Sequence, residues 1–163
     1  MCIFNWSKLQ YMPTTIQFVI VILIKVLQIF NSDNLFYKIV QVNSLYIAIG
    51  WLLVYIFAGY KKIIKFYHSL TDYKVSNINI ILWDIFVHFV PILIIGFPLL
   101  NKNYSSAYII SYLLFISYYV IVLDDKAVKL YNNMFTKKQL DFVFYILFPI
   151  IVLLFYISSI TKF

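Results

Sequence analysis

Five long apolar stretches, separated by short polar segments, are the main constraint on what this chain can fold into. They cover residues 14–30, 44–60, 77–100, 107–123 and 142–160. The shortest reach about 17 residues, the lower limit for an α-helix that crosses a bilayer core of about 30 Å. Continuous runs of this kind indicate helices rather than the alternating strands of a membrane barrel. The sequence therefore predicts an all-α integral membrane helical bundle with about five transmembrane helices.

The composition supports this class of protein. Hydrophobic residues make up 64% of the chain and charged residues 12%, which leaves too few polar side chains to cover a soluble domain of 163 residues. We expect a single transmembrane domain over residues 1–163, with no soluble domain. All 13 basic residues are Lys and all 6 acidic residues are Asp, and this codon bias indicates an AT-rich genome.

The lysines alternate between crowded and sparse segments along the chain. The first, third and fifth segments outside the apolar stretches hold Lys8, Lys61, Lys62, Lys65, Lys74, Lys126, Lys129, Lys137 and Lys138, whereas the other three hold only Lys38, Lys102 and Lys162. By the positive-inside tendency, the N-terminus is cytosolic and the C-terminus lies on the opposite side, which agrees with an odd number of crossings. The net charge of +7 is explained in this way, and we expect no nucleic-acid partner.

The stretch 77–100 carries an acid and an imidazole four residues apart. Asp84 and His88 fall on one helical face, where they can hydrogen-bond. An ionisable residue at the centre of a span costs about 2.5–3.5 kcal/mol on insertion scales, so both should face the bundle interior or water. Pro91 lacks an N–H and frees the carbonyl of Val87. The dyad is a candidate site for a proton or a polar ligand; the alternative is a packing hydrogen bond.

Three further residues complete the candidate ligand or proton pathway. If 14–30 is a span parallel to 77–100, Lys25 reaches the depth of Asp84 and an ion pair becomes possible; alternatively, Lys25 snorkels to the far interface. Ser111 and Tyr112 lie on the stretch 107–123, whose hydroxyl groups either line a polar interior or pack between helices.

Two other patterns are best explained by packing or by membrane flanking. Ser44, Ala48, Trp51 and Tyr55 share one face of the stretch 44–60, which also extends toward Phe36, and we expect that face to pack against a neighbour. In the segment after it, lysines alternate with apolar residues over positions 61–67. That segment is either an ordinary stop-transfer flank or a short interfacial helix on anionic lipid.

The sequence predicts no metal site and no cofactor. One His and one Asp are too few ligands, because the only other histidine, His68, lies in a polar segment. A hydrolase would need a nucleophile near His88, for which Ser111 is a candidate. The pattern Trp83, His88 and Pro91 resembles the histidine-bearing helix of the androgen-induced family of intramembrane hydrolases, which pair a threonine with a histidine. The likeness is confined to residues 82–91, and this chain has no threonine inside an early span.

From these patterns we expect a small multi-pass membrane protein that acts as a non-catalytic membrane component or assembly partner. Its partners are the lipid bilayer and either further copies of itself or other membrane proteins. The alternative is a proton-coupled or small-solute carrier whose polar core contains Asp84, His88 and Lys25. A further alternative is an intramembrane lipid hydrolase that uses His88 as a base.

Overall fold

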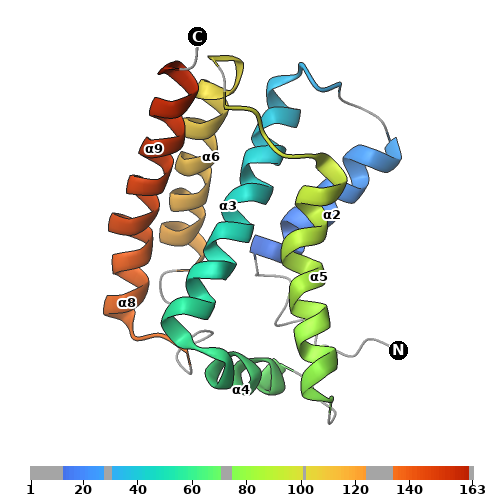
Figure 1. The fold of residues 1–163 in the computed structure, drawn as a ribbon, viewed down its shortest axis with the longest axis vertical. Coiled ribbons are helices and arrows are strands. Elements are labelled where there is room, and N and C mark those ends of the chain that lie inside the picture. Colours follow the sequence, from blue (N-terminus) through green and yellow to red (C-terminus); the bar gives the residue numbers. More distant parts are fainter. Residues whose placement is uncertain (1–12, 28–30, 71–74, 101, 124–133, 162–163) are drawn as a thin grey trace.

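The computed structural model of the protein describes residues 13–27, 31–70, 75–100, 102–123 and 134–161. Within these ranges the regular secondary structure is entirely helical (Figure 1). The helices are α2 (Pro13–Leu27), α3 (Leu35–Ala58), α4 (Tyr60–Leu70), α5 (Asn77–Ile95), α6 (Ser105–Tyr118), α8 (Lys137–Phe142) and α9 (Phe148–Thr161), with the short 3-10 turn η1 (Lys102–Tyr104) and the π-helical turns η2 (Tyr119–Leu123) and η3 (Val143–Leu147). The all-α prediction is confirmed for the described residues.

Four stretches of helix in the described part of the chain are long and apolar enough to cross a membrane. They are α3, α5, the run Lys102–Ile121 and the run Lys137–Thr161. Each exposes large apolar side chains: the exposed fraction is 74% for Ile56, 69% for Leu93 and 61% for Leu154. Such surfaces suit a lipid environment. The fifth apolar helix, α2, has 15 described residues, and residues 28–30 of its predicted range lie outside the described part.

Several helix boundaries differ from those predicted, and local chemistry explains two of them. α3 begins at Leu35, before residue 44, because the side chain of Asn34 caps it by accepting from the N–H of Phe36 at 2.8 Å. The predicted extension toward Phe36 is therefore confirmed. α5 ends at Ile95, before residue 100, because Gly96 adopts a φ of 90° that ends the helix.

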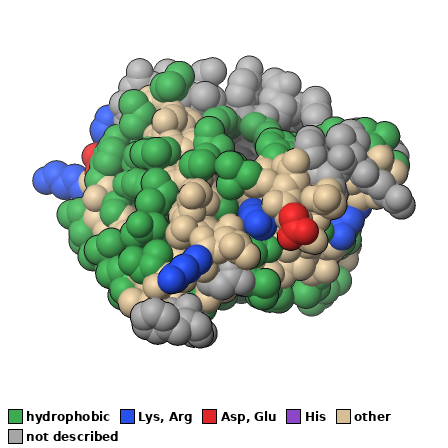
Figure 2. Space-filling view, turned by 90° about the horizontal axis from the view of Figure 1, so that it is seen from above, with side chains coloured by type: hydrophobic (Ala, Val, Ile, Leu, Met, Phe, Trp, Pro, Cys, Tyr) green, Lys and Arg blue, Asp and Glu red, His purple; other side chains and the backbone are tan. Residues whose placement is uncertain are grey.

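α3 lies in the middle of the bundle, with α2 and α5 on one side and α6 and α9 on the other (Figure 1). On the second side, Val42 and Tyr46 of α3 pack with Tyr108 of α6 and Phe148 of α9 in one buried cluster. Seen from the end where α9 finishes, apolar side chains cover much of the periphery, and a few Lys and Asp side chains lie on the end face (Figure 2). The chain thus has apolar flanks and charged ends.

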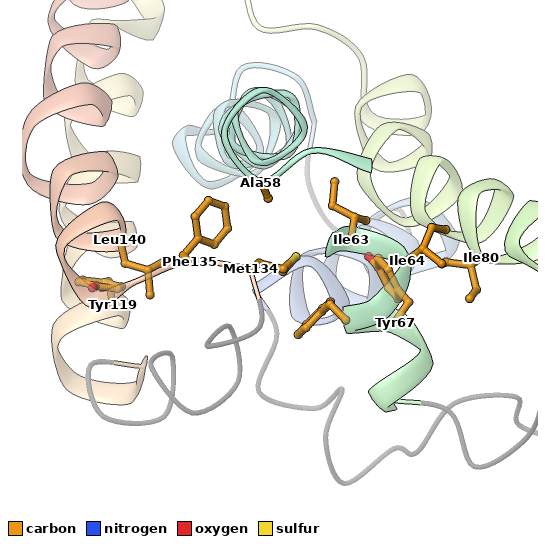
Figure 3. Close-up of a cluster of buried hydrophobic side chains, with 10 residues drawn as sticks. Ala58, Ile63, Ile64, Tyr67, Ile80, Tyr119, Met134, Phe135 and Leu140 are labelled. Atoms are coloured by element: carbon orange, nitrogen blue, oxygen red, sulfur yellow. The ribbon is translucent and has the colours of Figure 1, made fainter. Parts of the chain in front are cut away.

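α4 lies across the opposite end of the bundle, roughly perpendicular to α3 (Figure 1). Gly59, with a φ of 76°, makes the sharp turn between the two helices. Four apolar residues of α4 are buried together with Ala58, Ile80 and Leu140 (Figure 3): Ile63, Ile64, Phe66 and Tyr67. The segment after α3 is therefore a helix, and its apolar side packs against the rest of the bundle.

Candidate functional site

Asp84 lies on the third turn of α5 and is the most deeply buried charged residue described, with 1% of its surface exposed. A carboxylate removed from water in this way costs several kcal/mol unless hydrogen bonds replace its hydration. The environment supplies them from three helices. Trp51, Tyr55, Tyr67 and His88 surround this carboxylate inside the apolar bundle.

α3 contributes two donors from its last turns. The indole Nε1 of Trp51 donates to Oδ2 of Asp84 at 2.6 Å, and the hydroxyl of Tyr55 donates to the same oxygen at 3.0 Å. The two residues are four positions apart and therefore share one helical face. Their rings also contact each other, with centroids 4.3 Å apart.

α4 contributes the third donor. The hydroxyl of Tyr67 donates a short hydrogen bond to Oδ1 of Asp84. Tyr67 is buried, and in Figure 3 it lies beside Ile64 and Ile80. Because α4 runs across the end of the bundle, one turn of this helix reaches both the apolar cluster and the buried carboxylate. The carboxylate thus joins α3, α4 and α5.

His88 is the fourth partner and comes from α5 itself. Its Nδ1 lies 2.7 Å from the backbone oxygen of Asp84 and 3.2 Å from Oδ1 of the same residue. Both neighbours are acceptors, so Nδ1 carries the proton. The imidazole lies beside Trp51, with centroids 5.8 Å apart, and 12% of the side chain is exposed. The i, i+4 contact predicted for Asp84 and His88 is present.

The other predicted members do not join this site. Lys25 lies with its Nζ 5.6 Å from the ring centroid of Tyr37, and the hydroxyl of Tyr37 donates to the carbonyl of Ile95, at the far end of α5 from Asp84. The structure therefore does not form the ion pair between Lys25 and Asp84, one of the two alternatives from the sequence; Lys25 lies toward the far end of α5, as the other alternative placed it. The physical reason is the register of α2: Phe18, and not Lys25, stands level with the dyad, its ring centroid 5.4 Å from that of Phe86.

Ser111 and Tyr112 lie on the opposite side of α3. The hydroxyl of Ser111 donates to the carbonyl of Ile39 at 3.3 Å, and Tyr112 packs at the edge of the cluster around Tyr46 and Phe148. The five predicted site residues thus separate into the dyad Asp84 and His88 and three residues held elsewhere.

A second group of polar side chains, not expected from the sequence, links the helices nearer the other end of the bundle. Gln17 of α2 donates to the carbonyl of Val40 at 2.8 Å and to the hydroxyl of Ser44 at 2.9 Å. Gln41 donates to the carbonyl of Ile95 at 3.1 Å and accepts from the hydroxyl of Tyr104 at 2.6 Å. Each bond crosses between helices, and the carbonyl of Ile95 belongs to the last turn of α5, where the helix leaves it without an intrahelical partner.

The sequence argument missed Trp51, Tyr55 and Tyr67 as partners of Asp84. The signal available was chemical. Trp and Tyr each carry one polar group that needs a partner when buried in lipid, and Trp51 and Tyr55 share a face four residues apart. A buried acid on the next helix is the natural acceptor for such a pair. Tyr67 gave no comparable signal, because its position depends on the fold of α4.

The carboxylate of Asp84 has hydrogen-bond donors at both of its oxygens. An ionised carboxylate only accepts, and its two oxygens here receive bonds from Trp51, Tyr55, Tyr67 and His88. Among the residues that the structure describes, no group of three His, Cys, Asp or Glu side chains lies close enough to hold a metal ion.

Comparisons with known proteins identify no relative. No family model, no curated protein and no solved structure matches the chain. The site must therefore be understood from its own geometry.

We expect Tyr55→Phe to lower the free energy of unfolding by about 1.5–3 kcal/mol, because it removes one hydrogen bond to a buried charged group and leaves the ring packing intact. Tyr60→Phe is the matched control, since Tyr60 begins α4 with its ring 47% exposed. The measurement is SDS titration of the purified protein in mixed micelles. Equal, small losses for both variants would show that the bond from Tyr55 to Asp84 adds no stability.

Proposed function

We propose that the chain is an integral membrane protein with five crossings and a non-catalytic role, as a membrane component or assembly partner. The observation that carries the non-catalytic role is the satisfied carboxylate of Asp84. Its donors come from three helices: Trp51 and Tyr55 from α3, Tyr67 from α4 and His88 from α5 itself. An acid surrounded in this way holds the helices in fixed positions relative to one another, and we call it a fixed joint between helices.

The lysines support an orientation. Lys61, Lys62 and Lys65 on α4 and Lys137 and Lys138 at the start of α8 lie at one end of the bundle. By the positive-inside tendency this end is cytosolic. α9 finishes at the other end, so the C-terminus lies on the far side.

The position of α2 supports a fifth crossing. Lys25, near its end, lies over Tyr37 at the far end of the bundle, while Phe18 already stands level with Phe86. The chain therefore rises toward the far side along α2. We therefore infer that the N-terminus is cytosolic.

We expect Cys2, the only cysteine of the chain, to react with a membrane-impermeant maleimide from the cytosolic side. Two variants in a Cys2→Ser background calibrate the assay: Lys62→Cys should react from the same side and Lys102→Cys from the opposite side. Labelling of Cys2 from the side of Lys102→Cys would contradict five crossings and leave four.

A proton-coupled or small-solute carrier is the second candidate, and the partly exposed His88 beside Asp84 favours it. The two functions differ in what Asp84→Asn does. If Asp84 only holds the helices together, we expect wild-type proteoliposomes to dissipate a pH gradient no faster than empty vesicles. We also expect Asp84→Asn to reduce the yield of folded protein. The reason is that the new amide N–H₂ group faces several hydrogen-bond donors.

Asp141→Asn is the matched control for this experiment. Asp141 accepts from the hydroxyl of Tyr119 at 3.0 Å and lies in the short helix α8, so the loss of yield should be smaller. Wild-type proton flux that disappears in Asp84→Asn at unchanged yield would favour the carrier and contradict the fixed joint.

A further inference from the structure

α4 carries exposed lysines on one side and buried apolar residues on the other. At about 100° per residue, Lys61, Lys62 and Lys65 fall within a sector of about 100° on one side of this helix, and all three side chains are exposed. The opposite side is formed by Ile63, Ile64, Phe66 and Tyr67, which are 2–8% exposed. α4 contains no acidic residue that would neutralise the lysines.

The packing of α4 fixes its depth relative to the spans. Its apolar side contacts Ala58, the last residue of α3, and Ile80, in the first turn of α5. α4 therefore lies level with the ends of two apolar spans. In a bilayer that fits those spans, this is the depth of the lipid headgroups and not of bulk water.

The apolar side of α4 is used by the protein itself, so this helix does not need to insert into lipid. Tyr67 also bonds to Asp84, which fixes the rotation of α4 about its axis. As a result the lysines point away from the bundle at headgroup depth. Lysine ammonium groups carry three donors each and bind phosphate as point charges.

We propose that the lysine face of α4, formed by Lys61, Lys62 and Lys65, binds the headgroups of anionic phospholipids in the surrounding leaflet. This rests on the proposed membrane insertion with α4 on the cytosolic side, the leaflet that is rich in anionic lipid. It adds a ligand class and a site to that function. The occupant is anionic lipid because the site has charge complementarity and headgroup depth together.

The test uses the full-length protein reconstituted in phosphatidylcholine vesicles, with spin-labelled phosphatidylglycerol or spin-labelled phosphatidylcholine as the probe. Electron paramagnetic resonance measures the fraction of each labelled lipid that the protein restricts. Each lysine near an anionic surface contributes about fivefold in binding, so we expect phosphatidylglycerol to be preferred by at least about fivefold. The triple variant Lys61→Gln, Lys62→Gln, Lys65→Gln should lose most of that preference.

The matched control carries the same number of changes at the other end of the bundle: Lys25→Gln, Lys38→Gln and Lys102→Gln. It should keep the preference of the wild type. Equal association of both lipids with the wild type would overturn the proposal, and so would an equal loss of preference in both triple variants. The fraction of protein that stays in the vesicles after alkaline extraction is measured in parallel. This measurement distinguishes failed insertion of the protein from failed lipid selectivity.

Discussion

The buried carboxylate of Asp84 is the constraint on which the arrangement of α3, α4 and α5 depends. An apolar helix cannot hold an acid at 1% exposure unless donors replace the water it has lost. Those donors are Trp51, Tyr55 and Tyr67, together with His88 on the same helix. Their geometry sets the facing sides of α3 and α5 and the rotation of α4. In a bilayer, the environment proposed for this chain, apolar packing alone leaves such choices open, because lipid is as apolar as the side chains.

At the other end of the bundle, uncharged polar side chains also form hydrogen bonds between helices. Gln17 and Gln41 join α2 to α3 and α3 to α5, and the last carbonyls of α5 receive two of these bonds, from Tyr37 and Gln41. Between the two polar groups, α3 packs through aromatic and aliphatic side chains, and the hydroxyl of Tyr46 donates to the carbonyl of Tyr108. This division explains how a chain with few polar residues defines the positions of its helices: most of its buried polar side chains lie at helix–helix contacts.

The sequence predicted the all-α architecture, the long apolar helices and the contact between Asp84 and His88, because hydropathy and helical periodicity are local properties. It did not predict the register of α2, which depends on contacts such as Phe18 with Phe86, and it therefore left open whether Lys25 reaches Asp84 or the far interface. It also assigned Trp51 and Tyr55 to packing, although their polar groups are directed at the acid. The role of Tyr67 depends on the turn at Gly59 and on the docking of α4, which local patterns do not contain.

The most direct measurement is a double-mutant cycle between α4 and α5, built from Tyr67→Phe and Asp84→Leu. If the carboxylate holds α4 in place, the two changes should be strongly non-additive, with a coupling energy of about 1 kcal/mol or more, whereas Tyr67→Phe combined with the remote Ser111→Ala should be additive. Additivity within about 0.5 kcal/mol for Tyr67 and Asp84 would contradict the view that this hydrogen bond joins the two helices.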